Sequence, residues 1–416
     1  MDNLCIEEML LHLLYYLYSI LYYLCLLKLY SNKESRFAIY FTKPQLHIIA
    51  LIMSSMIKKG FAGKVTDVSD LMPFRHRTNV GKFLSKSPWN EDFIERALRN
   101  LVIKKIWELS KATKKPVYVA IDDTISERTV PSSKALKPIE KCSFHNSHLK
   151  RKTVYGHQLV TVMLICDDVV MPYSISIYDK KIKSKIQMAV ELIKSLPSPI
   201  NEGYVLCDSW YSCKKIFNAS KKAGFKYVGG LRTNRVIYPT NHERLGIKLN
   251  AFGKTLTRED VDLVKVGNSE YYVFSYKGKL NDLKEAVIVL SWPKEALFKD
   301  GCLRAFISPD SSMSLLDLLN HYKHRWPIEI FFRESKKKLG LDDYQIRSEK
   351  SIKRYLLIMM ITYVYCGLEV SEDTLKFSNG LKTARAQLEA EKITFIYKKT
   401  QAGESLDDIL EIFKAA

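Results

Sequence analysis

Short apolar runs alternating with helical segments constrain the fold of residues 116–231 more than any other feature of this chain. The expected elements, in chain order, are strands at 117–121, 154–165 and 169–177, a helix at 182–196, a strand at 204–207, a helix capped by Ser209, and a strand at 227–231. This order predicts an α/β core around a mixed sheet.

Acidic residues follow two of these apolar strands. Asp122 and Asp123 end the first strand, and Asp208 ends the strand at 204–207. Ligands gather at such strand ends in open α/β sheets. Neighbouring residues of a strand point to opposite faces, so only one of Asp122 and Asp123 can belong to a site shared with Asp208. Clustered carboxylates repel one another and favour a hard divalent cation such as Mg²⁺ or Mn²⁺ over zinc.

A third acidic residue lies in a helical segment at 322–336. Tyr322, Arg325, Glu329 and Lys336 fall within roughly 60° of one another on an ideal helix. Such a stripe can hold a metal at the carboxylate and phosphate oxygens at the other side chains. The plainer interpretation is a solvated basic face. Pro327 should either kink this helix or begin a new one.

The composition favours a globular, basic protein. Lys and Arg exceed Asp and Glu by 65 − 45 = 20, which indicates a polyanionic partner, either nucleic acid or an acidic membrane surface. The eight cysteines form no CxxC pair and no zinc-binding spacing. We therefore expect a cytoplasmic, nucleoid-associated protein without disulfides.

Residues 9–27 are almost entirely apolar and could just cross a bilayer. Acidic residues precede them, so they are no signal peptide. Five tyrosines in this stretch suit an interface better than a hydrocarbon core. We favour a buried or self-associating helix, or a start codon placed too far upstream, over a membrane span.

At this point the sequence resembles a family. Tyr322, Arg325, Glu329 and Lys336 match without a gap the Tyr-(2)-Arg-(3)-Glu-(6)-Lys signature of cut-and-paste DDE transposases of insertion sequences. Asp-Asp-Thr at 122–124 resembles the first catalytic block, in which the residue before Thr is the ligand, and Cys-Asp-Ser-Trp-Tyr at 207–211 resembles the second. The resemblance extends over about residues 43–368.

The resemblance implies an RNase H-like catalytic core with a β-rich insertion between the second and third acids. It implies that Asp123, Asp208 and Glu329 are catalytic and bind Mg²⁺ or Mn²⁺, as two ions, for cutting transposon ends and joining them to target DNA. Tyr322, Arg325 and Lys336 would contact DNA phosphates. The implied partner is double-stranded DNA, bound by a homodimer, with no small-molecule substrate.

The expected domain organisation follows from these patterns. It comprises an apolar N-terminal helix (1–35), a helical DNA-binding domain with a basic turn at 75–79 (36–112), the first part of the RNase H-like core (113–234), a β-rich insertion (235–308), the C-terminal helices of the core (309–370) and a C-terminal tail (371–416). The short helices with basic turns at 43–106 suit a helix-turn-helix module, although ordinary helical bundles show the same pattern.

Three alternatives stay open. The chain could be an RNase H-like nuclease that cuts without joining, a domesticated DNA-binding protein, or a membrane-anchored protein. Related transposases form a DNA hairpin and stack a flipped base on a tryptophan of the insertion, but Trp292, the insertion's only tryptophan, does not have the expected spacing. We interpret His145, His148 and His157 as structural or DNA-contacting.

Overall fold

A mixed β-sheet organises the computed structural model, which describes residues 41–69, 78–147, 150–281, 283–368 and 376–414. The sheet order is β2-β3-β1-β5-β6-β12-β11-β10-β7-β8, with β4 on β3 and β9 on β10. The core strands are β1 (Val117–Glu127), β2 (Ser143–Ser147), β3 (Lys152–Cys166), β4 (Val169–Ile177), β5 (Gly203–Cys207) and β6 (Lys226–Leu231). β1, β5 and β6 run parallel, while β3 is antiparallel to β1. The expected α/β core with a mixed sheet is confirmed.

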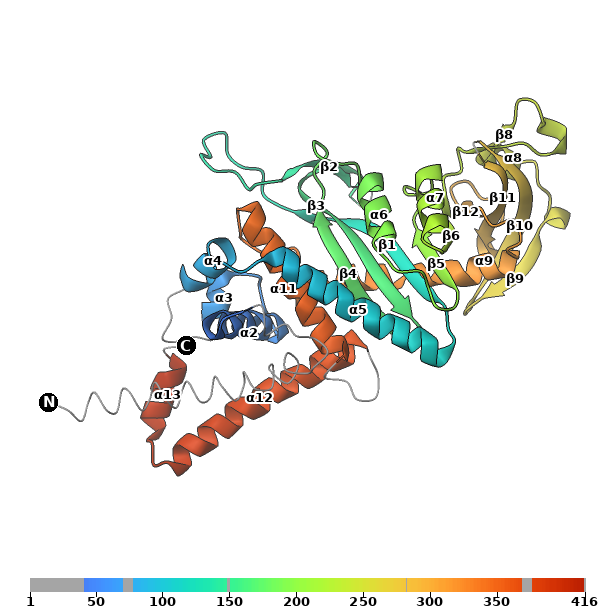
Figure 1. Cartoon of the computed structure of the whole chain (residues 1–416). Coiled ribbons are helices and arrows are strands. Elements are labelled where there is room, and N and C mark those ends of the chain that lie inside the picture. Colours follow the sequence, from blue (N-terminus) through green and yellow to red (C-terminus); the bar gives the residue numbers. More distant parts are fainter. Residues whose placement is uncertain (1–40, 70–77, 148–149, 282, 369–375, 415–416) are drawn as a thin grey trace.

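The β-rich segment continues the same sheet. Its strands are β7 (Val236–Ile237), β8 (Ile247–Lys248), β9 (Asp262–Val266), β10 (Ser269–Leu280), β11 (Leu283–Pro293) and β12 (Arg304–Ser308), with the short helix α8 (Leu249–Gly253) and the 3₁₀ turns η2 (Thr240–His242), η3 (Arg258–Asp260) and η4 (Lys294–Ala296). β12 pairs with β6, so hydrogen bonds run unbroken from the core into this segment (Figure 1).

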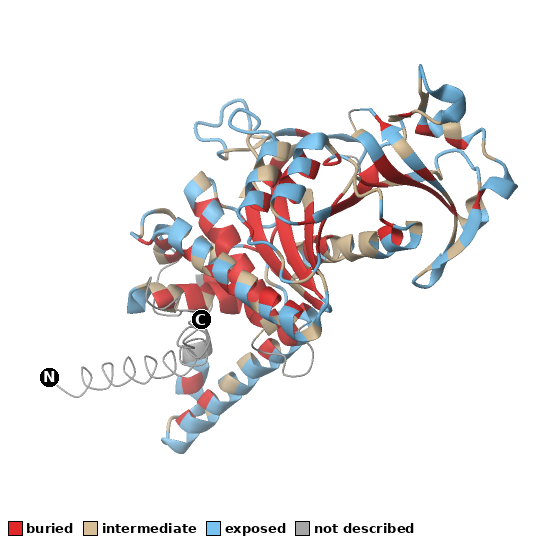
Figure 2. Cartoon of the chain, turned by 45° about the vertical axis from the view of Figure 1, so that its right-hand side comes forward, coloured by how far each residue is buried: buried red, intermediate tan, exposed pale blue. Residues whose placement is uncertain are grey.

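Helices pack on the core strands in two groups. α6 (Lys185–Lys194) packs on β3, and α7 (Lys214–Lys222) packs on β6. The other group consists of α9 (Leu315–Tyr322), the 3₁₀ turn η5 (Lys323–Arg325) and α10 (Pro327–Lys338), which pack along β12, β6, β5 and β1. Figure 2 shows that burial is greatest in the core strands and the helices against them.

Pro327 begins a new helix, as one of the two sequence interpretations predicted. The segment at 322–336 is therefore three pieces, not one continuous helix: α9 ends at Tyr322, η5 contains Arg325, and α10 begins at Pro327. Glu329 and Lys336 share α10, and Arg325 and Glu329 keep the i,i+4 contact of a helix across its start.

The N-terminal helices are packed onto the C-terminal half of the chain. They are α2 (Lys43–Ile57), α3 (Val65–Ser69), α4 (Thr78–Ser85) and α5 (Glu91–Thr113), and α2, α4 and α5 all contact α11 (Glu349–Leu368). Most of the basic turn at 75–79 and the whole apolar stretch 9–27 lie outside the described residues. The described helices include none with the length and hydropathy needed to cross a bilayer. That these helices contact DNA stays a prediction.

The segment beyond residue 371 is helical where the structure describes it. α12 (Phe377–Gln401) packs by its first turns on α11, and α13 (Leu406–Lys414) folds back from its end (Figure 1). No element was predicted for this region, because the apolar residues of α12 do not form an amphipathic stripe.

One buried arginine connects α11 to the N-terminal helices. Arg354 has no exposed surface, and its guanidinium lies 4.2 Å from the Trp89 ring. It pairs with Glu91 at 3.0 Å and donates hydrogen bonds to the backbone carbonyls of Phe83, Leu84, Ser87 and Trp89. A charge buried this deeply is tolerated only when all its donors are satisfied.

Replacing Arg354 with methionine should lower the free energy of unfolding by about 3–5 kcal/mol, because it leaves Glu91 and buried carbonyls without their donor. Urea unfolding followed by circular dichroism measures the change. Lys353→Met is the matched control, since Lys353 is exposed and its pair with Glu349 contributes at most about 1 kcal/mol. Equal destabilisation by both substitutions would contradict the assignment.

Candidate active site

The parallel pairing of β1 with β5 brings two carboxylates together. The ladder matches Tyr118 with Tyr204 and ends with Ile121 opposite Cys207, and Asp122 and Asp208 are the residues that follow this last matched pair. Burial first, and then the charge of Asp208, raise the pKa of Asp122.

Asp122 is held at the sheet by an arginine. Arg325 donates from Nη1 to Asp122 Oδ2 at 2.9 Å, and the Asp123 amide donates to Asp122 Oδ1 at 2.8 Å. Burial, and next the charge of Asp208, raise the pKa of Asp122 to about 7, although Arg325 opposes this. Asp122 is therefore a carboxyl group whose charged form needs a cation nearby.

Asp208 sits in a tight turn immediately after β5. Its Oδ1 accepts the Trp210 amide at 2.9 Å, and its carbonyl accepts the Tyr211 amide at 3.3 Å. Burial is the main cause of a raised pKa of Asp208, and the charge of Asp123 adds to it. The turn fixes the carboxylate at the end of the strand.

Glu329 enters the site from the first turn of α10. Its Oε1 accepts a hydrogen bond from Nη2 of Arg325, the same guanidinium that binds Asp122. The Glu329 side chain is 36% exposed, against 18% for Asp122. Arg325 therefore joins the carboxylate of α10 to the carboxylate of β1.

Asp123, which the resemblance makes the first acid, has different partners from Asp122, and its role stays a prediction. Its Oδ1 accepts from Lys185 Nζ at 2.8 Å and from the buried Tyr211 hydroxyl at 2.9 Å, and its Oδ2 accepts from Gln158. The alternation of side chains along β1 gives the reason: only Asp122 shares a face with Arg325.

The three expected phosphate-binding side chains have intramolecular partners. Tyr322 is largely buried, with its ring centroid 4.7 Å from that of Phe306 and 5.6 Å from the Arg325 guanidinium. Lys336 Nζ donates to the Ile125 carbonyl at 2.9 Å and pairs with Asp342 at 3.0 Å. All three side chains lie near the ends of β1 and β6. The Tyr322 hydroxyl lies beside Gly230, where the lack of a side chain leaves room for it.

Four stacked rings hold α9 and η5 in place, and no sequence pattern predicted them. His324 stacks on Tyr118 at 4.2 Å, and His321 stacks on Tyr204 at 3.8 Å. The Tyr118 hydroxyl and His321 Nδ1 are 3.0 Å apart. These ring contacts hold α9 and η5, and with them Arg325, against β1 and β5.

The burial of His324 among these rings makes the free energy of unfolding depend on pH. Burial first, and then the charges of Lys323 and His321, lower the pKa of His324 to about 4, while Asp167 opposes the shift. An unfolded histidine has a pKa near 6.5. The folded state therefore prefers neutral His324, and this contribution to stability is present above pH 6.5 and is lost as the pH falls through 4.

We expect His324→Phe to lose less stability than the wild type between pH 6.5 and 4, because phenylalanine keeps the stacking and takes up no proton. Thermal unfolding midpoints at half-unit pH intervals measure this. His242→Phe, at an exposed position, is the control and should follow the wild type. Parallel curves for His324→Phe and the wild type would contradict the prediction.

Two of the remaining sequence candidates are buried, and one lies outside the described residues. His157 is fully buried, with Nε2 2.8 Å from the Glu140 carbonyl and Nδ1 2.9 Å from the Tyr344 hydroxyl. His145 is buried beside Ser143, and His148 is not described. Trp292 is only 2% exposed and packs edge-on against Phe298, so it offers no surface to a base.

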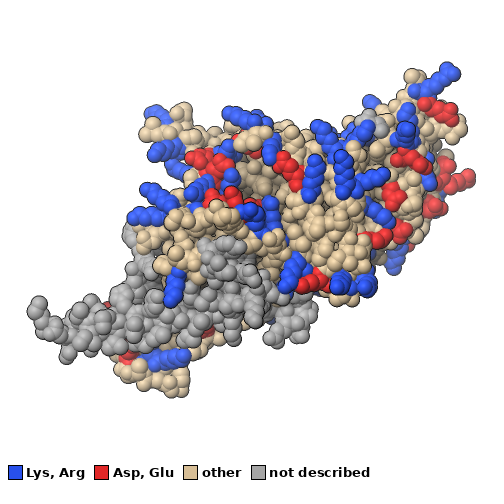
Figure 3. Space-filling model, viewed as in Figure 1, with Lys and Arg blue, Asp and Glu red and all other residues tan. Residues whose placement is uncertain are grey.

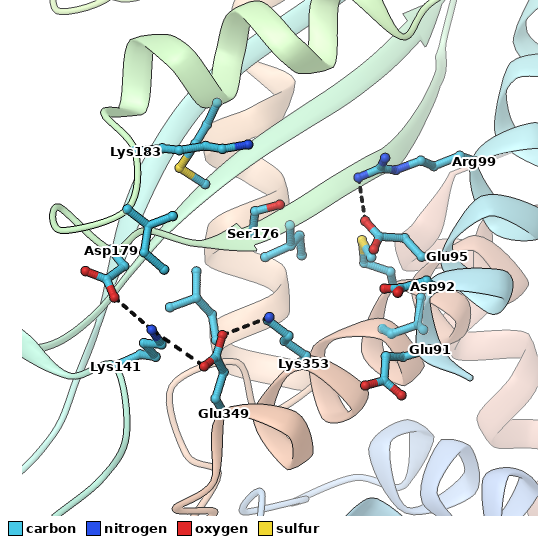
Figure 4. A pocket seen from close by; sticks show the side chains of 16 residues that line it. Glu91, Asp92, Glu95, Arg99, Lys141, Ser176, Asp179, Lys183, Glu349 and Lys353 are labelled. Atoms are coloured by element: carbon cyan, nitrogen blue, oxygen red, sulfur yellow. Dashed lines mark hydrogen bonds and ion pairs between the residues drawn. The ribbon is translucent and has the colours of Figure 1, made fainter. Parts of the chain in front are cut away.

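A separate cavity of about 330 Å³ lies between α5, β4, α6 and α11. Figure 4 shows that its charged walls pair with one another: Lys141 bridges Asp179 and Glu349, Glu349 also binds Lys353, and Arg99 binds Glu95. These ion pairs lie where the helices pack against the sheet. We assign no chemistry to this cavity.

The carboxylates have the chemistry of a divalent metal site. Asp122, Asp208 and Glu329 offer hard oxygen donors, and burial is the main cause of the raised pKa of the first two. Among the described residues no three His, Cys, Asp or Glu side chains converge on one point, because Arg325 lies between Asp122 and Glu329. The donors fit Mg²⁺ or Mn²⁺ once Arg325 moves aside.

This chain is similar to a known protein family and to a solved structure. Residues 114–365 match the family profile described as the transposase DDE domain. Among solved structures, the chain is similar to a piggyBac transposase in a synaptic complex with hairpin DNA, at 12% sequence identity and a TM-score of 0.47, covering 90% of this chain and 78% of that one. No curated protein matches the chain.

Proposed function

The chain belongs to the transposase DDE domain family and is a DNA transposase, and from this premise we propose how its site cuts and joins DNA. We propose that Asp122, Asp208 and Glu329 hold the divalent metal, with Asp122 in the place that the resemblance gives to Asp123. The supporting observation is that Arg325 links Asp122 to Glu329, and Asp122 and Asp208 directly follow the last residues that β1 pairs with β5.

The metal, as Mg²⁺ or Mn²⁺ in two ions, would activate the attacking oxygen and stabilise the leaving oxygen of a phosphodiester. The protein's own groups position the strand. Arg325 holds Asp122 and Glu329 together by charge, and a DNA phosphate offers its guanidinium an alternative bidentate partner. We propose that end binding draws Arg325 onto phosphate and frees both carboxylates.

Tyr322 and Lys336 complete this proposal as further phosphate contacts. Both lie near the strand ends that carry the acids, and Lys336 already binds oxygen atoms of Ile125 and Asp342. The implied partners are the transposon ends and the target duplex, held by a homodimer. The charge surplus of 20 suits this, since phosphate neutralisation dominates affinity for DNA.

The direct test incubates the purified protein with DNA from the flanks of its own gene, with Mg²⁺ or with a chelator. We expect cutting at the element's ends and, with pre-cut ends and a target plasmid, joined product. Cutting without joining would identify a nuclease instead. Metal-independent end binding without either reaction would identify a domesticated DNA-binding protein.

Replacing Lys336 with alanine should weaken end binding and reduce the slope of log affinity against log salt by about 0.9, the value of one phosphate contact. Fluorescence anisotropy of labelled end DNA between 50 and about 200 mM salt measures both quantities. Lys337→Ala, at an exposed position on the next residue of α10, is the control. An unchanged slope for Lys336→Ala would mean that this lysine contacts no phosphate.

A further inference from the structure

Joining brings two DNA segments to one set of carboxylates. In an in-line displacement the attacking and leaving oxygens lie on opposite sides of the phosphorus. The side chains expected to hold the transposon end, Tyr322, Arg325 and Lys336, all come from α9, η5 and α10. A second duplex therefore needs a cationic surface that approaches the acids from another side.

The structure has such a surface where α6 and α7 begin. We call it the α6–α7 patch and define it by one ring and four cations: Trp210, Lys185, Lys214, Lys215 and Arg232. Figure 3, in the view of Figure 1, shows Lys and Arg side chains gathered over these two helices. In the part of the chain that the structure describes, Lys214, Lys215 and Arg232 have no acidic partner, so their charges are available to phosphates.

An exposed tryptophan lies in this patch. Trp210 is 46% exposed, and the Lys185 ammonium and the Arg232 guanidinium lie 4.6 and 4.9 Å from its ring. Its backbone is fixed by the hydrogen bond to Asp208. An aromatic face flanked by cations suits nucleic acid, whose sugars and bases contact the ring while its phosphates meet the cations.

One residue of the patch, Lys185, meets an acid on the face opposite to Arg325. Lys185, the first residue of α6, binds Asp123 at 2.8 Å, whereas Arg325 binds Asp122 on the other face of β1. Arg232 also lines a hollow of about 480 Å³ that contains Asp208 and Tyr322. Arg232 and Tyr322 thus line one hollow beside Asp208, while Lys185 of the patch binds Asp123 on the other face of β1.

We propose that the α6–α7 patch holds the second duplex, the target DNA to which cut ends are joined. This inference rests on the proposed function. It assigns Lys214, Lys215 and Arg232 to target phosphates and Trp210 to contact with the sugar and base edge beside the attacked phosphate. It also assigns the two duplexes to different side chains: the target to the α6–α7 patch and the transposon end to Tyr322, Arg325 and Lys336. The family signature covers only α9 to α10 and does not make this distinction.

The test compares Lys214→Gln/Lys215→Gln with Lys221→Gln/Lys222→Gln. Both variants remove two lysines from α7. The second pair lies at the C-terminal end of the helix, about 10 Å along its axis from Lys214 and Lys215. Trp210→Ala is tested against Trp210→Phe, which keeps a ring. Each protein is loaded with labelled pre-cut end DNA and titrated with an unrelated duplex, and joining to a target plasmid is measured separately.

We expect Lys214→Gln/Lys215→Gln to reduce joining at least about tenfold and to lower the salt slope of target binding by about 1.8, two phosphate contacts. End binding and end cutting should stay within about twofold, as should every property of the Lys221/Lys222 control. Trp210→Ala should reduce joining and Trp210→Phe should largely restore it. Unchanged thermal unfolding shows that the variants are folded.

Two results would overturn the inference while leaving the proposed function standing. Normal joining by Lys214→Gln/Lys215→Gln, with a wild type that cuts and joins, would show that target DNA lies elsewhere. Equal losses of end binding and joining would assign the patch to the transposon end. A wild type that neither cuts nor joins would refute the proposed function itself, and the inference with it.

Discussion

Asp122→Asn is expected to reduce strand cleavage by at least about a thousandfold, the size of effect seen when an essential catalytic group is removed. Asparagine keeps the shape of the side chain and one oxygen, but it removes the negative charge that a divalent cation needs. Asp122 is the carboxylate of β1 that binds Arg325, which also binds Glu329. Rates on labelled end DNA in Mg²⁺ measure the loss.

Asp123→Asn is the matched control, one residue along the same strand with the same chemical change. We expect it to retain readily measurable cleavage, because Asp123 faces Lys185, Tyr211 and Gln158 instead of Glu329. Its main effect should be a lower unfolding midpoint, since Lys185 and Tyr211 lose a charged acceptor. The reverse order of activities would return the ligand role to Asp123.

The choice between these two aspartates shows where sequence reasoning stops. Alternation along a strand establishes that only one of them can share a face with Asp208. Which one depends on the register of β1 with β5 and on which helices cover each face, and both are tertiary properties. The resemblance selected the residue before Thr124, while the hydrogen bond from Arg325 links the preceding residue, Asp122, to Glu329.

The other elements also divide into those that the sequence predicts and those that depend on tertiary packing. The apolar runs predicted β1, β3, β4 and β5 because a strand buried on both faces has no polar alternation to obscure it. The pairing of β12 with β6 was missed, because strand edges carry no sequence code for their partner. The rings of Tyr118 and His321 are also brought together by the fold from positions 203 residues apart in sequence.

The segment at 322–336 shows how an ideal helix describes only part of a site. An ideal helix places its four side chains on one stripe, but Pro327 starts a new helix, α10. Arg325 still meets Glu329, because the two are four residues apart and Trp326 between them keeps right-handed helical angles. The break also lets Arg325 reach back to Asp122 on the sheet.

Glu329→Gln is expected to abolish cleavage, again by at least about a thousandfold, while end binding stays within about twofold. The amide oxygen can still accept from Arg325, so the position of α10 is kept, but the anionic metal ligand is lost. Because Glu329 is 36% exposed, the unfolding midpoint should change little. Cleavage and gel-shift assays on the same end DNA separate these effects.

Glu334→Gln provides the control on the same helix, since Glu334 pairs with Lys338 and makes no contact with Arg325. It should cut at close to the wild-type rate. If Glu329→Gln instead lowers end binding and cleavage in parallel, Glu329 acts by orienting Arg325 toward DNA and holds no metal. Because the two roles predict opposite results in the binding assay, this pair of substitutions decides whether the carboxylate of α10 completes the site of Asp122 and Asp208.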